Sequence, residues 1–510
     1  MARKSERFKF SASSIDNLQL HQRENNCRRG VAYREILVCL IAIMLAACNQ
    51  ATNPPRKAPV IPQNTAQSAI DIEHEEALKR IWPYEDPNLQ AYVEEVGYTI
   101  LDVTPLERSE VRFTVVDSEI VNAFALPEGN IYITRGLLAY LNSEAELAAI
   151  LGHEISHLVE RHGEKIRDDL YRLPYLDKYL PGLDSPHLSK LGKVSSENLL
   201  AEYNQQQELE ADKKAAEYLY LAGYSTDAMF RVIATLFAYD WFETSLYDLD
   251  ADKNYSEIQF HTHPDYEVRL EYALTVYENL PESNGAIKPV RYFEEIDGLL
   301  WGQNPARGSM FDELFVHTGF NITFSFPENW SAQNSPYYLI AQSDDNLAEL
   351  AMAVFELQEH ASPKEILLSL AVQDVELIAE NFNNQFRSAY GRANFDFSGA
   401  EPEPGYIFVI SDRNIAFLFF ATDGGLNKHF NEILAMLSDF RALSKSEIEL
   451  VQPLELLFDN VSGKLSWDEL AGETPIPYSS LQLQLINAST AKREPTPKGY
   501  VKLIRKRESQ

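Results

Sequence analysis

The sequence His153-Glu154-Ile155-Ser156-His157 lies in a stretch whose residues favour a helix. Ser143 followed by Glu146 is typical of a capping box, apolar residues then recur at helical spacing, and Gly163 is expected to end the helix. Histidines four positions apart share one helix face, so both imidazoles can bind one metal ion. Glu154 projects beside them, where a carboxylate can take a proton from water on that metal. Taken alone, the pattern also fits a surface helix with incidental histidines.

A second motif, Glu208-Leu209-Glu210-Ala211-Asp212, follows on another helical stretch. A hydrolytic zinc site has three protein ligands and one open position, so two histidines need a third partner. Glu208 can be that ligand, and Asp212, one turn later, can accept a hydrogen bond from the second ring nitrogen of a ligand histidine. The alternative is the solvated face of an acidic helix. Together the two motifs predict one catalytic Zn²⁺ per chain, held by His153, His157 and Glu208.

These motifs resemble the zinc endopeptidases that group type I CAAX prenyl proteases with HtpX-like proteases, and among them the periplasmic BepA-like branch. The resemblance spans about residues 70–280 and rests on blocks in the expected order: Asn122–Gly129, Ile131–Leu138, His153–His157, Glu208–Asp212, and His263-Pro264 followed by Arg269-Leu270. It implies proteolysis of unfolded or misassembled envelope proteins, with Glu154 acting as general base and then as general acid.

Residues 122–126 and 130–134 flank a Pro-Glu-Gly turn and predict a β-hairpin. An edge strand beside the metal would bind substrate as an added strand through its main chain. The candidate substrate-binding residues are therefore Asn122, Ala123, Phe124 and Ala125. An ordinary hairpin packed in the core is compatible with the same residues.

The His-Pro element adds two candidate residues. His263 is a candidate catalytic residue that would stabilise the oxyanion, or a removable fourth metal ligand, although it could equally belong to a polar loop. Arg269 is a candidate for orienting the substrate or His263, and pairing with one of the many acidic residues is the alternative.

The N-terminal region predicts a lipoprotein. Residues 36–47 form an apolar run preceded by arginines, too short to span a bilayer and suited to a signal peptide. The sequence Leu45-Ala46-Ala47-Cys48 resembles a bacterial lipobox, with Cys48 as the lipidated residue of a protein on the outer membrane facing the periplasm. A plain secretory signal is the alternative. Cys48 would be the single cysteine of the mature chain, and the formal net charge of −31 argues against nucleic-acid partners.

The expected fold class is α+β, with a mostly helical metalloprotease domain of the gluzincin type that carries a small β-hairpin edge. An α+β sandwich that faintly resembles PsbP-like modules follows, and then a short C-terminal module with a weak LysM-like pattern and a basic tail. The expected boundaries are signal peptide 1–47, tether 48–68, zinc metalloprotease domain 69–285, linker 286–309, α+β domain 310–443 and C-terminal module 444–510.

Two other functions remain open at this point. One is a chaperone-like periplasmic binding lipoprotein with a largely latent zinc site, and the other is a structural lipoprotein whose zinc only stabilises the fold. Peptidoglycan and the outer-membrane assembly machinery are further candidate partners. Glu154 argues against the chaperone-like function and against the structural function, because neither substrate binding nor structural zinc needs a carboxylate beside the metal.

Overall fold

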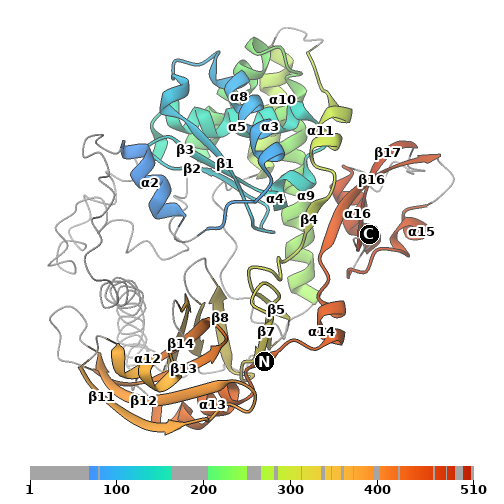
Figure 1. Ribbon diagram of the computed structural model, residues 1–510. Helices are drawn as coiled ribbons and strands as arrows, with labels where there is room; N and C mark the ends of the chain where they lie inside the picture. The colour runs from blue at the N-terminus through green and yellow to red at the C-terminus, as the bar shows by residue number, and fades with distance from the viewer. Residues whose placement is uncertain are drawn as a thin grey trace, which may run out of the picture. The chain divides into compact units, whose positions relative to one another are not determined.

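The computed structural model describes residues 68–78, 81–163, 205–249, 266–280 and 285–506, the last with internal gaps of one to nine residues (Figure 1). The chain divides into two compact units. The helical unit comprises Asn64–Pro305 together with Lys445–Gln510, and the strand-rich unit comprises Ala306–Ser444. Both helices and sheets are present, so the expected α+β class is confirmed.

The helical unit contains most of the helices and a small sheet. Its elements before residue 306 are α2 (Ala69–Ala77), α3 (Pro87–Leu101), the 3-10 turn η1 (Arg108–Glu110), β1 (Arg112–Val116), β2 (Ala123–Ala125), β3 (Asn130–Thr134), α4 (Arg135–Tyr140), α5 (Glu144–Val159), α8 (Gln205–Leu221), α9 (Asp227–Leu249), α10 (Tyr266–Asn279), α11 (Pro289–Glu295) and β4 (Leu299–Trp301). Helix α5 is central, because it packs against α3, α8, α9 and strand β2 (Figure 1).

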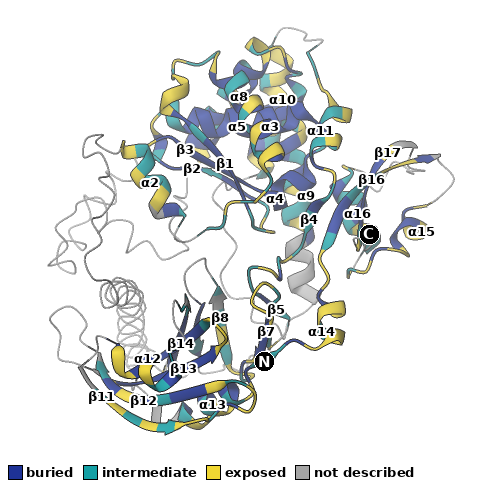
Figure 2. Ribbon diagram, viewed as in Figure 1, coloured by how far each residue is buried: buried dark blue, intermediate teal, exposed yellow. Residues whose placement is uncertain are grey.

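The small sheet has the strand order β1-β3-β2, with β1 parallel and β2 antiparallel to β3. The expected hairpin is thus present, and β2 is the outer strand of the sheet. The parallel partner β1 was not expected from the sequence. Every residue of β3 is buried, because helices cover this sheet and leave none of its central strand in contact with water (Figure 2).

Helix α5 begins as the sequence predicts but ends earlier. The Ser143 hydroxyl accepts a hydrogen bond from the backbone N–H of Glu146 at 3.2 Å. The Glu146 carboxylate accepts from the N–H of Asn142 at 2.6 Å, one residue before the N-cap. The helix stops at Val159 because Arg161 adopts a left-handed backbone with φ of 55°. Such a residue commonly ends a helix, although glycine is the usual choice.

The end of the chain belongs to the helical unit, which differs from the expected separate module. The elements here are α14 (Lys445–Leu450), β16 (Leu454–Ser462), α15 (Trp467–Ala471), α16 (Ser479–Ile486) and β17 (Lys498–Lys506). Strand β16 pairs with both β17 and β4, so part of the expected linker is a strand of this unit. The physical reason is a shared core: Leu483, Leu503 and Ile504 lie in one hydrophobic cluster with residues of α3, α4 and α5.

The described residues of the strand-rich unit form two antiparallel sheets and two helices. Its elements are β5 (Ser309–Phe311), β6 (Leu314–His317), β7 (Ile322–Ser325), β8 (Trp330–Asn334), β9 (Leu339–Ser343), β10 (Glu349–Glu356), α12 (Pro363–Ser369), β11 (Gln373–Glu380), β12 (Arg387–Phe395), β13 (Glu403–Asp412), β14 (Ile415–Thr422), α13 (Leu426–Ser438) and β15 (Arg441–Ala442). The strand orders are β11-β12-β13-β14-β10-β9-β8 and β15-β7-β6-β5. Strands β13 and β14 form a hairpin, and a capping box at Ser362 begins α12.

The start of β7 separates buried from exposed apolar residues. Ile322, Phe324 and Phe326 are buried, whereas Phe320 is 36% exposed and precedes β7. Asn321 has φ of 56°, so the backbone turns there before the strand begins.

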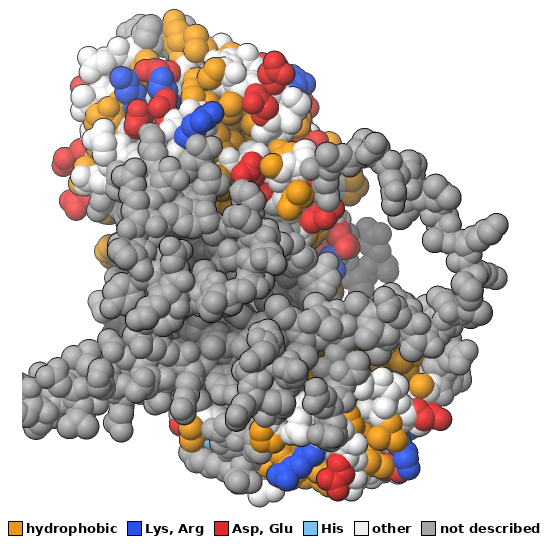
Figure 3. All heavy atoms as spheres, turned by 90° about the vertical axis from the view of Figure 1, so that its left-hand side faces the viewer, with side chains coloured by type: hydrophobic (Ala, Val, Ile, Leu, Met, Phe, Trp, Pro, Cys, Tyr) orange, Lys and Arg blue, Asp and Glu red, His pale blue; other side chains and the backbone are white. Residues whose placement is uncertain are grey.

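In the part of the chain that the structure describes, no helix has the length and apolar character needed to span a bilayer. The apolar run at 36–47, Cys48 and the expected tether lie outside the described residues. On the face shown in Figure 3, acidic and basic side chains lie among hydrophobic ones on both units.

Candidate metal centre

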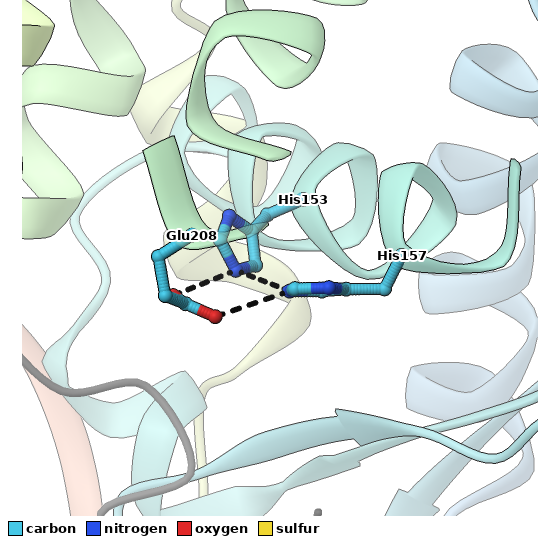
Figure 4. Close-up of side chains that lie close together, drawn as sticks. All are labelled: His153, His157 and Glu208. Atoms are coloured by element: carbon cyan, nitrogen blue, oxygen red, sulfur yellow. Dashed lines mark hydrogen bonds and ion pairs between the residues drawn. The ribbon is translucent and has the colours of Figure 1, made fainter. Parts of the chain in front are cut away.

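Three side chains from two helices converge at the centre of the helical unit (Figure 4). His153 and His157 come from α5 and Glu208 from the first turn of α8, and each is at most 3% exposed. The two Nε2 atoms of the histidines are 3.0 Å apart. The Glu208 carboxylate places one oxygen 3.4 Å from Nε2 of His153 and the other 3.4 Å from Nε2 of His157. His153 and His157 are four positions apart on α5, so both rings lie on one face of the helix and come close together.

This triangle has the dimensions that a zinc ion needs. With bonds of about 2.0–2.2 Å, a tetrahedral ion holds its ligand atoms roughly 3.3–3.6 Å apart. The two separations of 3.4 Å between Glu208 and the histidines agree with this range, and the 3.0 Å between the two histidines is slightly shorter. Two imidazoles and a carboxylate are also the donor set of a catalytic zinc site. The three residues therefore fit the metal that the sequence predicts, and they form the one such group found among the described residues.

Asp212 and Arg269 lie behind this triangle. Oδ1 of Asp212 is 2.8 Å from Nδ1 of His153, the ring nitrogen that points away from the other two ligands. The Arg269 guanidinium, from α10, donates to both oxygens of Asp212 at 2.8 and 2.7 Å, and its Nη1 lies 2.8 Å from Oε2 of Glu208. Asp212 and Arg269 are both 2% exposed. Asp212 thus stands where a carboxylate fixes the orientation of a ligand histidine.

The electrostatics of the site favour a cation. Burial alone would lower the pKa of His153, but the carboxylates of Glu208 and Asp212 outweigh it and raise that pKa to about 9. Burial acts to raise the pKa of Asp212, but Arg269 and His153 keep it below its usual value. A positive charge between His153 and Glu208 is therefore stabilised, and a divalent ion supplies more of it than a proton does.

Glu154 is 1% exposed and follows His153 directly on α5, within the same buried turn. Strand β2 also contacts α5, so the expected substrate strand lies against the helix that carries the histidines. Next to it, Ala125 and Pro127 line a small recess together with His157 and Arg161.

The backbone of β2 has a defined direction. Thr134 N–H donates to the carbonyl of Asn122 at 3.0 Å, and Leu126 N–H donates to the carbonyl of Asn130 at 2.8 Å. Hydrogen-bonding pairs alternate along antiparallel strands. The N–H and C=O groups of Ala123 and Ala125 therefore point away from β3, toward the position that an added strand would take.

Sequence reasoning missed His162. This residue is fully buried, and its Nδ1 lies 2.9 Å from Nδ1 of His157. The available signal was a third histidine five positions after His157, just past the end of a helix. A helical projection does not place position i+5 on the face of position i, so the proximity depends on the left-handed turn at Arg161.

His263 lies outside the described residues, and both roles considered for it stay predictions. The substrate role of Arg269 also stays a prediction. Its contacts with Asp212 and Glu208 agree with the alternative of pairing with acidic residues.

Comparison with known proteins agrees with this geometry. Residues 84–276 match the model of peptidase family M48. The beta-barrel assembly-enhancing protease of Yersinia pestis is 29% identical over 154 residues, which cover 28% of this chain and 32% of that protein. A mitochondrial metalloendopeptidase OMA1 of Arabidopsis thaliana is 38% identical over 111 residues, or 22% of each chain. The matched region thus spans about a third or less of these two relatives.

A solved structure of a cyanobacterial PsbP from Synechocystis is 12% identical to this chain and has a TM-score of 0.21. The match covers 27% of this chain and 96% of that one. Such a score is too low to support a fold assignment, so the PsbP-like character of the strand-rich unit stays a prediction.

The matched residues contain α5 and α8, the two helices that carry the candidate metal ligands, and the strand β2 that packs against α5. The resemblance seen in the sequence motifs is therefore confirmed. Residues 84–276 are thus similar to peptidase family M48, and within them the chain is similar to the beta-barrel assembly-enhancing proteases.

Proposed function

We propose that this chain is a zinc-dependent endopeptidase of the periplasm that hydrolyses peptide bonds in unfolded or misassembled envelope proteins. The observation that carries the proposal is the buried triangle of His153, His157 and Glu208, with Glu154 on the same turn of α5. A site that only stabilised the fold would not need Glu154 there. The names of the related beta-barrel assembly-enhancing proteases support a substrate in the envelope.

Zinc bound in this triangle would polarise the peptide carbonyl and lower the pKa of water in its open position. Glu154 then accepts the proton of the attacking water and returns it to the leaving amine. Asp212 holds the His153 ring in the orientation in which Nε2 faces the metal. His263 would stabilise the oxyanion or cover the metal at rest.

The substrate would lie along β2 as an added strand. Main-chain hydrogen bonds to Ala123 and Ala125 do not depend on side-chain identity, so this mode suits unfolded chains of varied sequence. An extended strand also presents its peptide carbonyls at regular intervals to the helix α5 behind β2. Lipidation at Cys48 would hold the enzyme on the outer membrane, facing the periplasm.

The test is the substitution Glu154→Gln, which preserves size and polarity but removes the proton acceptor. Zinc content should be unchanged, while cleavage of an unfolded outer-membrane protein should fall by about 10²–10⁴-fold. Glu160→Gln is the matched control, because Glu160 caps the same helix outside the triangle. Equal cleavage by wild type and Glu154→Gln would refute the proposal, and retained capture of substrate without cleavage would separate binding from hydrolysis.

A further inference from the structure

The two histidines of the metal centre have different partners behind them. Nδ1 of His153 faces the Asp212 carboxylate, whereas Nδ1 of His157 faces Nδ1 of His162 at 2.9 Å. His162 reaches this position because the chain reverses at Arg161, whose N–H donates to the carbonyl of Leu158 at 3.1 Å. The left-handed backbone at Arg161 is uncommon for a residue with a side chain, and such conformations persist where the surrounding structure requires them.

The metal site determines which nitrogen of His157 carries hydrogen. Nε2 of His157 points at the other ligand atoms, so its lone pair must be free to bind metal. A neutral imidazole has a single N–H, and for His157 this must be Nδ1–H. A hydrogen bond to His162 then requires that Nδ1 of His162 accepts.

The second ring nitrogen of His162 faces a carboxylate on α8. If Nδ1 of His162 accepts, then Nε2 of His162 carries hydrogen and faces Oε2 of Glu210, 3.5 Å away. Glu210 is on α8, two residues after the ligand Glu208, and its side chain is 42% exposed. The carboxylate thus favours the tautomer of His162 in which Nδ1 is the acceptor.

We propose that His162 is a positioning residue of the metal centre: it accepts the Nδ1 hydrogen of His157 and so fixes the ring and tautomer with which His157 binds zinc. The inference deepens the proposed function, since it needs zinc in the triangle but no particular substrate. Zinc-binding histidines usually donate their second N–H to a carboxylate, carbonyl or water, and losing that partner weakens metal binding by about 10–100-fold.

The test compares His162→Leu with His162→Asn in the full chain. Leucine removes the acceptor, whereas Oδ1 of asparagine can take the place of Nδ1. Zinc affinity, measured by competition with a chelator, should fall by about 10–100-fold in His162→Leu and recover for the most part in His162→Asn. The visible absorption spectrum of the Co²⁺-loaded protein should change in the leucine variant and return toward wild type in the asparagine variant.

His74→Leu is the matched control. His74 is in the same unit and its Nδ1 lies 2.9 Å from the Tyr132 hydroxyl, so the change removes an imidazole hydrogen bond away from the metal. Its zinc affinity should equal that of wild type.

If His162→Leu binds zinc as tightly as wild type, or if His162→Asn binds it as weakly as His162→Leu, the proposal is overturned. If the leucine variant does not fold, the asparagine variant still tests the proposal, because the proposal requires His162→Asn to bind zinc with nearly the affinity of wild type. None of these readouts uses proteolysis, so they are independent of the Glu154→Gln result.

Discussion

The interiors of the two units differ in chemistry. The helical unit buries ionic side chains on several elements, namely Arg135, Glu144, Glu146, Glu154, Glu208, Asp212, Arg269, Glu455 and Lys502. The larger cluster of the strand-rich unit is dominated by aromatic rings such as Phe315, Phe324, Phe408, Phe417 and Phe419. Among the described residues of that unit, the buried acidic and basic side chains are Glu349 and His429.

The difference follows the position of the candidate metal site, which lies in the helical unit. Removing a charge from water costs several kcal/mol, so a chain keeps buried ions only where partners or a metal compensate them. On the face shown in Figure 3, the visible parts of both units carry acidic and basic side chains. Apolar packing is enough for the strand-rich unit to fold. The helical unit also holds the candidate metal site, where Arg269 contacts both Glu208 and Asp212.

Arg269→Met should produce the largest loss of stability. The change leaves the carboxylates of Glu208 and Asp212 buried without the guanidinium that contacts both. Breaking a buried ion pair by removing one partner costs about 3–5 kcal/mol. Urea unfolding with a chelator present, followed by hydrogen-exchange mass spectrometry, would measure the loss and assign it to the helical unit. Added zinc should recover part of it, because the ion supplies positive charge beside Glu208.

Arg392→Met provides the comparison in the other unit. Arg392 is an exposed residue of β12 whose Nη2 donates to the Tyr406 hydroxyl at 3.0 Å. Its removal should cost at most about 1 kcal/mol. Equal losses in the two variants would show that buried ions do not distinguish the units.

Lys502→Met should have the second-largest effect. Nζ of Lys502 is buried and donates to the backbone carbonyls of Ala139 and Leu141 at 2.9 and 2.8 Å, at the turn from α4 into the metal-binding helix α5. Burial lowers the pKa of Lys502 to about 7, and the nearby Glu146 opposes that shift. Leaving such carbonyls unsatisfied costs about 1–3 kcal/mol.

The matched change is Lys506→Met, at the exposed end of the same strand β17. Calorimetry should show a lower Tm for Lys502→Met and a Tm near that of wild type for Lys506→Met. A Lys502→Met variant as stable as wild type would mean that the last strand does not support the start of α5.

Local geometry explains which parts of the site could be predicted from sequence. The HExxH and ExxxD spacings place side chains on one helix face, so His153, His157, Glu208 and Asp212 are recognisable once two helices are assumed. The hairpin of β2 and β3 follows in the same way from alternation and its turn.

Contacts between distant segments could not be predicted. Lys502 meets Leu141 across 361 residues, and no periodicity relates the two. The C-terminal segment was therefore expected as a separate module, although its apolar residues complete the core around α5. The partners of Arg269 could not be predicted either, because any acidic residue is a possible partner for a lone arginine until the packing of α10 against α8 is known.

The smallest expected effect is a pH dependence confined to the strand-rich unit. His429 on α13 places Nε2 3.0 Å from Asp345 and Nδ1 2.7 Å from Glu432. Burial alone would lower the pKa of His429, but the two carboxylates raise it above its usual value. The folded state therefore holds the proton more tightly than the unfolded state, whose pKa is about 6.5. The stability gained is complete below about pH 6.5 and is lost as pH rises through the folded value.

Calorimetry of wild type and His429→Asn across this range would measure the effect. It should be about 1 kcal/mol or less, because the carboxylates of Asp345 and Glu432 are partly exposed.

His317 in the same unit provides a control of opposite sign: burial, assisted by Arg307, lowers its pKa to about 4. The stability that depends on His317 is present above about pH 6.5 and is lost as pH falls toward 4. His317→Asn should thus remove a loss on the acid side, whereas His429→Asn should remove a loss on the alkaline side. If His429→Asn left the alkaline loss unchanged, the contacts of His429 with Asp345 and Glu432 would not contribute to the stability of this unit.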